Sequence, residues 1–519
     1  MAAHARVPVA LLAAALVLGL YLRIDAARHD SLSQWDEAYH ALVAKHLTAR
    51  PLEPTLYRTP LEGREHDPRN WTESRVWLHK PPLALWLMAG SIALLGDDET
   101  VVRLPSVILG TLSILLTFLL GRELLGAHGG LSPRLALEAG AVAALLHAVS
   151  RLHIRLVSGT VPVDHVDLAA AFFVELTVLL LAVAARRESL GLALLGGASL
   201  GLAYLTKSMP TLVALAAALP LFLGTERGGR RRALRLLGAA VLAALAVALP
   251  WQVYCATRWP QEYAWEARYT FRHLFEALEG HARPAWWYVE LIPRHYDGVR
   301  PLAYVLVLGA TLAGAVLAWR RRDRGLAAAL VWALLPYVVF SLARTKVYSY
   351  VGTAVPAVLL LVGFAAVELR ARLAGRRLAP AAVAAVVALQ VVAGAVRAVR
   401  ADHDVAAWNR VYDYPAFRAA MKEIGATRPG RRTILFNVGD GKAIQAMYYT
   451  GGTAYPEVPS PDLVRRLVGR GYAVYLVVDA FGTNTERLRD IERAGALAGV
   501  TVIRVPPPKA LPASHPFGI

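Results

Sequence analysis

The amino-acid sequence predicts an all-α polytopic membrane protein with a small α/β domain at its C-terminal end. Hydrophobic residues make up 56% of the 519 residues, and the mean hydropathy is +0.42. The apolar residues come in long uninterrupted runs, as in chains that cross a membrane several times. Arginine clusters lie between these runs, where cytoplasmic anchors are expected. The formal net charge of +18 therefore reflects membrane topology, and we expect no nucleic-acid partner.

The first apolar run covers residues 7–24, and a crossing helix needs about 20 apolar residues. Arg6, the apolar core and the small residues Ala26 and Ala27 also fit a cleaved signal peptide. We favour a membrane span because many more apolar runs follow. The single cysteine, Cys255, leaves no disulfide framework and no thiolate metal site.

Length and charge interruption define the other candidate spans. They lie at residues 82–96, 102–121, 135–150, 166–185, 190–206, 209–224, 234–256, 301–319, 326–343, 347–369 and 379–398. The arginine clusters predict cytoplasmic loops near residues 187, 230, 322 and 374. The outer loops are then 25–80, 150–165, 207–208, 257–300 and 344–346, together with the chain beyond residue 400.

The run at 82–96 is predicted not to cross the membrane. An even number of crossings must separate the outer loops 25–80 and 150–165, yet three apolar runs lie between them. The run at 82–96 is short and opens with prolines, so we expect it to lie at the interface or to re-enter. This leaves about eleven crossing helices and some interfacial helices.

The chain changes character near residue 400. Residues 1–400 are predicted to form the transmembrane domain and residues 401–519 an extracytoplasmic α/β domain, with short apolar runs at 433–438, 472–478 and 500–505. Gly439-Asp440-Gly441 follows the first of these runs, but the full glycine fingerprint of a dinucleotide site is absent. A tight turn is the better interpretation, and no nucleotide is expected.

Unusual polar side chains gather in the predicted outer loops. They are the acidic residues Asp36, Glu37, Asp164, Asp167 and Glu279, the basic residues Lys80, Lys207, Arg268, Arg272, Arg344 and Lys346, and the histidines His79, His273 and His281. Any one of them could be a solvated or snorkelling side chain at a helix end. Asp164 and Asp167 favour a functional role, because an ionisable group at the mouth of a span is costly unless it faces a cavity or a partner.

Carboxylates beside lysine and arginine at a membrane surface suit glycosyl transfer from a phospholipid-linked sugar. The cations can hold a phosphate leaving group while a carboxylate takes a proton from an attacking hydroxyl. A transporter or a lipid flippase with outer-face ion sites is the alternative. A transporter predicts polar residues near the middle of the membrane, whereas the charges here concentrate in the outer loops.

A series of stretches, in order, resembles the membrane glycosyltransferases with the GT-C fold, in the branch that contains aminoarabinose-lipid A transferase and protein O-mannosyltransferases. The stretches are WDEAYHALVAKHL, HKPPLALWLMAGSIALLG, RLPSVILGTLSILLTFLLGRELLG, DHVDLAAAFFVEL, YLTKSMPTLVAL, EGHARPAWWYV and SLARTKVYSYVGTAVPAVLLL. The similarity runs from about residue 7 to residue 369. Any one motif is weak, but their common order and spacing are specific.

The resemblance implies roles for the acidic residues. Asp36 matches the catalytic acidic residue of the family and would act as general base on the acceptor hydroxyl in an inverting single displacement. Glu37 would orient Asp36 or have no part. Asp167 stands at the family spacing before Phe172-Phe173, and Asp164 is an equally good candidate for the second acidic role.

The resemblance also implies phosphate and metal ligands. The donor phosphate would be held by Lys80, Lys207, Arg344 and Lys346, with a hydrogen bond from Tyr350, although phospholipid headgroup anchoring is the alternative for these cations. Relatives use a divalent ion, so zinc, manganese or magnesium is a candidate cofactor. The family often has glutamate where this chain has His79. His79, His273 and His281 with an acidic partner could form a metal site, and histidines that only hydrogen-bond are the alternative.

Together these features predict a multi-pass glycosyltransferase of a bacterial cytoplasmic membrane, with its active site and C-terminal domain outside. The donor would be a polyprenyl-phosphate sugar whose tail lies among membrane lipids, and the acceptor a lipid or a cell-envelope glycan, as in lipid A modification. Protein O-mannosylation is the alternative within the enzymes. Arg268, Arg272 and Glu279 are further candidates in the outer loop 257–300, and the C-terminal domain is a candidate for acceptor recognition.

Overall fold

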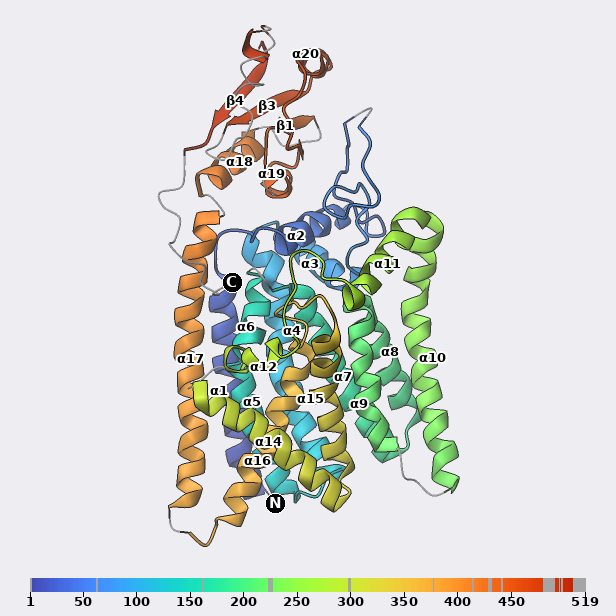
Figure 1. The fold of residues 1–519 in the computed structure, drawn as a ribbon, viewed down its shortest axis with the longest axis vertical. Helices are drawn as coiled ribbons and strands as arrows, with labels where there is room; N and C mark the ends of the chain where they lie inside the picture. Colours follow the sequence, from blue (N-terminus) through green and yellow to red (C-terminus); the bar gives the residue numbers. More distant parts are fainter. Residues whose placement is uncertain are drawn as a thin grey trace.

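The structure is a computed structural model that describes most of the chain. The described residues are 2–61, 64–160, 163–222, 227–296, 300–376, 378–412, 415–427, 432–439, 442–478, 491–493, 495 and 498–506. They form a long helical bundle with a small α/β domain at one end (Figure 1). We call the end of the bundle that carries this domain the site end.

Each candidate span predicted from the sequence contains a helix. The helices of the bundle are α1 (Ala2–Ala27), α2 (Asp36–Leu47), α3 (Pro82–Leu95), α4 (Glu99–Leu120), the π-helix η1 (Gly121–Ala127), α5 (Pro133–Ala148), α6 (Arg151–Ser158), α7 (His165–Arg187), α8 (Leu190–Lys207), η2 (Met209–Leu212), α9 (Val213–Phe222), α10 (Arg227–Arg258), α11 (Pro260–Phe275), α12 (Trp287–Glu290), α13 (Ile292–His295), α14 (Arg300–Arg321), α15 (Arg324–Leu342), η3 (Gly352–Ala354), α16 (Val355–Arg372) and α17 (Ala379–Tyr412).

Several of these helices begin at a side chain that accepts a hydrogen bond from a free backbone N–H of the first turn. The capping residues are Asp98 for α4, Ser132 for α5, Asp164 for α7, Ser189 for α8 and Asp323 for α15. The spans therefore start where a short polar residue precedes an apolar run. This places Asp164 at the mouth of α7, as the sequence predicts.

Nine of the described helices are long and apolar enough to cross a membrane, or ten if the bent pair α5 and α6 forms one broken span. The sequence analysis expects about eleven crossings. The difference lies in Met209–Phe222, which is a shorter apolar helix. At about 1.5 Å per residue, this segment is shorter than a hydrocarbon core of roughly 30 Å.

Helix α3 covers the run that the topology argument excludes from the crossings. It is too short to qualify as a span. Figure 1 shows α2 and α3 together at the site end, beneath the C-terminal domain. This position agrees with the expectation that residues 82–96 do not cross.

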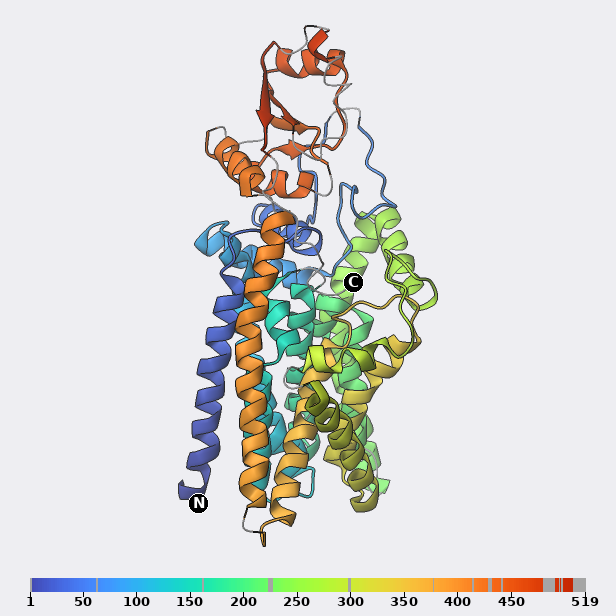
Figure 2. The same cartoon turned by 60° about the vertical axis from the view of Figure 1, so that its left-hand side comes forward.

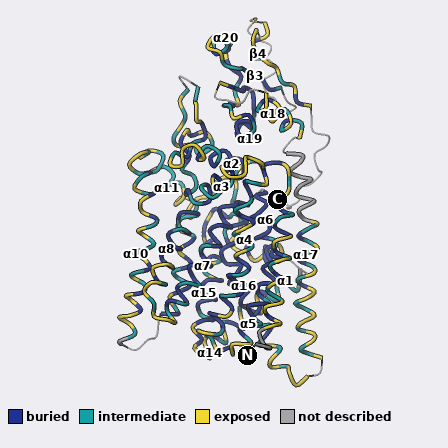
Figure 3. Tube along the Cα trace, turned by 180° about the vertical axis from the view of Figure 1, so that it is seen from behind, coloured by how far each residue is buried: buried dark blue, intermediate teal, exposed yellow. Residues whose placement is uncertain are grey.

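Burial is greatest in the middle of the bundle and least at its edges. The apolar windows of α7 and α16 are 72% and 78% buried, whereas those of α10 and α17 are 17% and 11% buried. Figure 3 shows exposed residues along both edge helices. Figure 2 shows the blue α1 beside the orange α17, so the two ends of the transmembrane domain pack together.

Ionisable side chains are also buried inside the bundle, which the sequence analysis missed. Arg23 of α1 donates to the carbonyl oxygens of Gly19 and Ala148 at 3.1 and 3.2 Å. Glu175 of α7 accepts a hydrogen bond of 2.6 Å from Ser113 of α4. Both side chains therefore have protein partners, and their hydrogen bonds join α1 to α5 and α4 to α7.

The C-terminal domain contains a parallel sheet flanked by helices. Its elements are α18 (Pro415–Thr427), β1 (Thr433–Phe436), α19 (Lys442–Thr450), β2 (Thr453–Ala454), α20 (Pro461–Gly469), β3 (Ala473–Val478) and β4 (Val500–Arg504). The strand order is β2-β1-β3-β4, with every pair parallel and Ile434 opposite Val474. The three strands predicted from sequence are found. Strand β2 is too short for a sequence pattern, and Asp440 and Gly441 lie outside the described residues.

The hydrophobic core of the C-terminal domain is continuous with the site end of the bundle. Leu32, Leu42 and Leu85 belong to the same buried cluster as Phe417 and Tyr448 of the domain. Helix α17 also runs on to Tyr412, past the predicted boundary at residue 400. The domain is therefore packed onto α2 and α3.

We predict that Gly121→Ala destabilises the fold. A Cβ at Gly121 would lie 2.5 Å from the Cα of Gly140, so the backbones of η1 and α5 would have to separate. We expect a loss of about 1–3 kcal/mol, measured as a lower midpoint of thermal unfolding in detergent. Gly238→Ala is the control, because a Cβ there meets nothing within 4 Å. Equal midpoints for the two variants would contradict this packing.

Candidate functional site

Three charged side chains meet at the site end. Asp36 is the first residue of α2, Asp164 caps α7, and Lys80 lies in the loop before α3. Lys80 Nζ is 3.1 Å from Asp164 Oδ2 and 3.6 Å from Asp36 Oδ1. The side chain of Asp36 is 39% exposed, whereas that of Asp164 is 5% exposed. One ammonium group therefore connects an accessible carboxylate with a buried one.

The charges of this cluster stabilise one another. Burial lowers the pKa of Lys80, but Asp164 and Asp36 outweigh this effect, so the pKa is raised well above its ordinary value. Burial raises the pKa of Asp164, but His40 and Lys80 outweigh it, so the pKa is lowered. The ammonium and the carboxylate are thus both charged at neutral pH.

A second ion pair lies beside the cluster. Lys207, the last residue of α8, contacts Asp167 in the first turn of α7. The Lys207 ammonium also lies 5.0 Å from the ring centroid of Tyr350. The negative charge of Asp167 also raises the pKa of Lys80. The structure therefore brings both candidates for the second acidic role to one site. Asp164 pairs with Lys80, and Asp167 pairs with Lys207.

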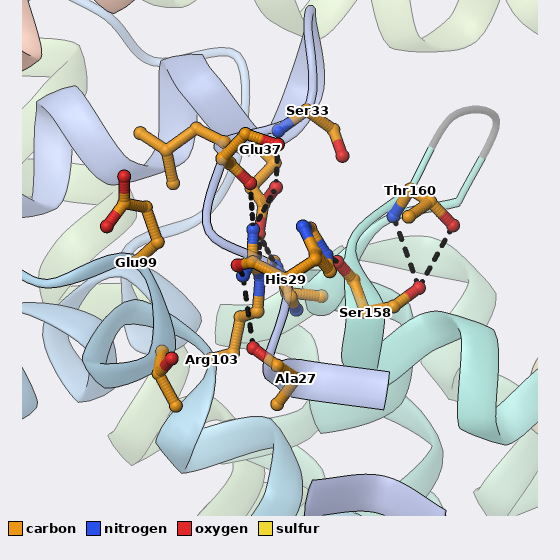
Figure 4. A network of polar contacts seen from close by, with 12 residues as sticks. Ala27, His29, Ser33, Glu37, Glu99, Arg103, Ser158 and Thr160 are labelled. Atoms are coloured by element: carbon orange, nitrogen blue, oxygen red, sulfur yellow. Dashed lines mark hydrogen bonds and ion pairs between the residues drawn. The ribbon is translucent and has the colours of Figure 1, made fainter. Parts of the chain in front are cut away.

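Glu37 has a different environment from its neighbour Asp36. Its side chain is fully buried and accepts hydrogen bonds from Arg103 Nε at 2.6 Å and Arg103 Nη2 at 3.0 Å (Figure 4). His165 Nε2 lies 3.0 Å from Glu37 Oε1, and the backbone N–H of Ser33 donates to Oε2 at 2.6 Å. Burial raises the pKa of Glu37, but Arg103 and His165 hold it well below its ordinary value. Glu37 therefore anchors α2 and is closed to substrate.

Arg103 extends this anchor to the connection between α1 and α2. It donates to the carbonyl oxygens of Ala27, His29 and Ser31 at 3.1, 2.5 and 2.5 Å. The arginine of α4 thus holds both the start of α2 and the chain that leads to it. Figure 4 shows Arg103 between Ala27 and Glu37, with His29 close by.

His40 joins Asp36 and Asp164, and the sequence analysis missed it. Asp36, His40 and Asp164 are the one group of three acidic, histidine or cysteine side chains among the described residues whose ligand atoms lie within 4.8 Å of one another. Burial lowers the pKa of His40 to about 4, so its imidazole is neutral at pH 7. The sequence contained a signal for His40, because Asp36 and His40 are four residues apart and residues at this spacing share a face of a helix.

Loop residues next to Lys80 contact α11 and the loop that follows α11. His79 stacks on Trp71 with ring centroids 4.4 Å apart, and its Nδ1 is 3.2 Å from Glu266 Oε2. Glu279 accepts hydrogen bonds from Trp71 Nε1 at 3.0 Å and from the Tyr269 hydroxyl at 2.7 Å. These contacts join the loop before α3 to α11 and the loop that follows it.

The two other candidate histidines, His273 and His281, lie in the same region as His79 and Glu279. The hydroxyl of Tyr350 is 3.4 Å from His273 Nδ1, and His281 accepts a backbone hydrogen bond from Lys346 through its carbonyl oxygen. Burial lowers the pKa of His273 to about 4. His79, His273 and His281 all lie outside the group of possible metal ligands found among the described residues.

Four other candidate cations are exposed or bind groups outside the cluster. Arg272 pairs at 2.7 Å with Glu276, the residue that follows α11, and Arg268 donates to the carbonyl oxygen of Ala264. Arg344 is exposed. The Lys346 ammonium donates to the carbonyl oxygen of Ala343. The role of Arg344 and Lys346 at the donor phosphate stays a prediction, and so does any role of Arg268 and Arg272 as further outer-loop candidates. Lys80 and Lys207 lie at the cluster.

Comparison with known proteins gives matches to membrane glycosyltransferases. The family model described as dolichyl-phosphate-mannose-protein mannosyltransferase matches residues 79–254. An undecaprenyl phosphate-alpha-4-amino-4-deoxy-L-arabinose arabinosyl transferase of Pseudomonas aeruginosa (strain LESB58) is 32% identical over 301 residues, which are 56% of this chain and 50% of that protein. The chain thus spans about half the length of the curated relatives it matches.

Solved structures match over nearly the whole chain. ArnT from Cupriavidus metallidurans in the apo state has a TM-score of 0.61 and 18% identity, over 96% of this chain and 91% of ArnT. The chain has the GT-C fold. ArnT bound to undecaprenyl phosphate has a TM-score of 0.60 and 17% identity, over 95% and 89% of the two chains. The GT-C architecture predicted from the sequence motifs is confirmed.

We predict that Glu37→Gln destabilises this GT-C chain, because the charge of Arg103 would stay buried without its carboxylate. We expect a loss of about 3–5 kcal/mol at pH 7. Because folding lowers the pKa of Glu37, its stabilisation is present above an unfolded-state pKa of about 4.3 and is lost as the pH falls further. Thermal unfolding measured from pH 7 to pH 3 should show that the difference in stability between the wild type and Glu37→Gln becomes smaller below about pH 4.

The control for this prediction is Glu53→Gln, which breaks an exposed ion pair of 2.9 Å with Arg50. Exposed pairs contribute little, so this variant should unfold close to the wild type. A Glu37→Gln protein as stable as Glu53→Gln at pH 7 would show that the buried pair is not needed.

Proposed function

We propose that the protein transfers a sugar from a polyprenyl-phosphate donor to an acceptor hydroxyl at the outer face of a bacterial cytoplasmic membrane. One observation carries the proposal: the accessible carboxylate of Asp36 lies within 3.6 Å of the Lys80 ammonium at the end of a GT-C bundle. The relatives named as arabinosyl transferases, and the ArnT structure with undecaprenyl phosphate, support this donor class.

Asp36 fits the role of general base. It is accessible, whereas its neighbour Glu37 is sealed by Arg103. In the proposed step a carboxylate oxygen of Asp36 takes the proton of the acceptor hydroxyl, whose oxygen attacks the anomeric carbon. The bond from this carbon to the phosphate oxygen breaks, and polyprenyl phosphate leaves with the electron pair. A single displacement of this kind inverts the anomeric configuration.

Lys80 and Lys207 fit the role of phosphate ligands. Both ammonium groups lie at the mouth of the bundle, each against a buried aspartate. The carboxylates keep the two cations in place before the donor binds, and the cations can then compensate the charge that develops on the leaving phosphate. Tyr350 lies under the Lys207 ammonium and can donate a hydrogen bond to a phosphate oxygen.

The acceptor is proposed to be a lipid or a cell-envelope glycan, in keeping with the resemblance of the sequence motifs to the aminoarabinose-lipid A transferase branch. A protein hydroxyl is the second candidate, which the match of residues 79–254 to the mannosyltransferase family favours. The two acceptor classes can be separated by incubating purified protein with a panel of polyprenyl-phosphate sugars and with a lipid, glycan or peptide acceptor. A lipid or glycan acceptor, but no peptide, should increase the release of free polyprenyl phosphate under the first proposal.

We predict that Asp36→Asn reduces sugar transfer by about 10²–10⁴-fold, because an amide cannot accept the proton. The variant should fold and insert normally, because Asp36 is partly exposed. The measurement is release of free polyprenyl phosphate. Asp97→Asn is the control, since Asp97 is an exposed carboxylate of the same end that pairs with Lys45. Full activity of the Asp36→Asn protein would exclude the general-base role.

A divalent metal fits the group Asp36, His40 and Asp164. Two carboxylates and a neutral imidazole suit zinc or manganese. Neither ring nitrogen of His40 makes a hydrogen bond, and its Nδ1 lies 3.3 Å from Asp164 Oδ1. Such an ion would help to neutralise the leaving phosphate. Lys80 contacts the same two carboxylates, so its ammonium and a metal would compete for them.

We predict that manganese binding depends on Asp164 and not on Asp167. Asp164→Asn should weaken Mn²⁺ affinity at least about tenfold, because it removes a ligand. Asp167→Asn, which changes a neighbouring aspartate that pairs with Lys207, should bind like the wild type. The loss of the free Mn²⁺ signal in electron paramagnetic resonance measures binding without any activity assay. Equal affinities for the two variants would exclude a metal on this group.

A further inference from the structure

The backbone that leads into Asp36 is strained. Trp35, the residue before Asp36, has φ 69° and ψ −127°, a conformation that a bulky L-residue rarely adopts. Such a conformation persists only where the surrounding structure over-determines it. The contacts of residues 31–35 therefore decide how the carboxylate of Asp36 is presented.

The bundle supplies one set of these contacts. Arg103 donates to the carbonyl oxygen of Ser31 at 2.5 Å, and Glu37 accepts from the N–H of Ser33 at 2.6 Å. Leu32 and Ser33 are fully buried. This set fixes the backbone on either side of Leu32 but does not reach the polar groups of Leu32 itself.

Helix α19 of the C-terminal domain supplies the contacts of Leu32. The Gln445 Nε2 donates to the carbonyl oxygen of Leu32 at 2.8 Å, and the N–H of Leu32 donates to the Tyr449 hydroxyl at 3.3 Å. Both polar groups of this one peptide position are thus bound by the domain. Gln445 and Tyr449 are four residues apart, so they lie on the same face of α19.

Other contacts hold this face of the domain in place. The Tyr449 hydroxyl donates to Glu99 Oε1 at 3.0 Å, and Lys422 of α18 contacts the same carboxylate oxygen at 2.8 Å. Glu99 begins α4, the helix that also carries Arg103. The two sets of contacts on residues 31–35 are therefore tied to one helix.

We propose that the C-terminal domain is a positioning element for Asp36. Through Gln445 and Tyr449, α19 holds Leu32 and so maintains the strained turn at Trp35 that presents the carboxylate. Gln445 and Tyr449 act through Leu32 and are positioning residues. This inference rests on the proposed function, because it gives the domain a part in the reaction of Asp36 that is distinct from acceptor recognition.

The proposal gives a physical route between the domain and the chemistry. A displacement of α19 by an ångström would shift Leu32, and the turn at Trp35 would relax toward an unstrained conformation. A misplacement of this size at a reacting group can cost about 10²-fold in rate. The domain then controls turnover and not the affinity for the donor.

The test uses three substitutions on α19 in the full-length protein. Gln445→Leu and Tyr449→Phe each remove one hydrogen bond to Leu32, and Tyr449→Phe also removes the hydrogen bond to Glu99. Tyr448→Phe is the matched control, because the Tyr448 hydroxyl donates to the carbonyl oxygen of Asp97 at 2.8 Å. The control therefore also loses a hydrogen bond between α19 and the bundle, but one that does not involve residues 31–35.

Two measurements separate positioning from general stability. In the polyprenyl-phosphate release assay, Gln445→Leu and Tyr449→Phe should lower kcat at least about tenfold with the donor KM unchanged, whereas Tyr448→Phe should keep the wild-type kcat. In native hydrogen exchange, the amides of residues 31–36 should exchange faster in the first two variants only. The same kcat and the same exchange in all three variants would overturn the proposal.

The Asp36→Asn protein, assayed beside these variants, separates a failure of the proposed function from a failure of the positioning role. If Asp36→Asn is inactive while Gln445→Leu and Tyr449→Phe behave like Tyr448→Phe, the proposed function stands and the positioning role fails. If Asp36→Asn is fully active, the proposed role of Asp36 fails. Hydrogen exchange of residues 31–36 then still decides whether α19 holds this segment.

Discussion

The buried ion pair between Glu37 and Arg103 is the interaction on which the site depends. Two charges removed from water must find each other and enough hydrogen bonds to compensate their lost hydration. Arg103 meets this demand with Glu37 and three backbone carbonyl oxygens between α1 and α2. Because Glu37 points inward to this arginine, the preceding residue, Asp36, is left at the accessible end of α2, and its position follows from the anchor.

The same electrostatic rule organises the accessible side of the site. Each lysine at the mouth of the bundle is matched by an aspartate, Lys80 by Asp164 and Lys207 by Asp167. A cation held in this way is ordered before any substrate arrives, which is the preorganisation that the proposed phosphate contact requires. The C-terminal domain adds a further constraint, since its core is continuous with α2 and its helix α19 binds the backbone of Leu32.

Much of the fold and part of the site could be predicted from local sequence features. Apolar run length predicted the helices, and short apolar runs predicted the strands of the C-terminal sheet. The parity of the crossings, with the short run and the prolines at residues 81 and 82, excluded α3 from the crossings. Asp36, Lys80 and Asp164 were all named in advance and lie together. His40 was overlooked although its spacing from Asp36 was visible. The burial of Arg23 and Glu175 in the bundle was missed because single charges interrupt apolar runs only briefly.

The sequence by itself determined the membrane class, the helices and the presence of chemically suitable residues, because hydropathy and motifs depend on residues that are neighbours in the chain. Tertiary structure alone decided that Glu37 is an anchor while Asp36 is accessible. Both side chains are carboxylates, and only their partners differ, Arg103 for Glu37 and Lys80 for Asp36. Tertiary structure also decided the contact between Leu32 and Gln445, which are 413 residues apart. Such pairs leave no local pattern, because only the packed chain brings their polar groups within hydrogen-bonding distance.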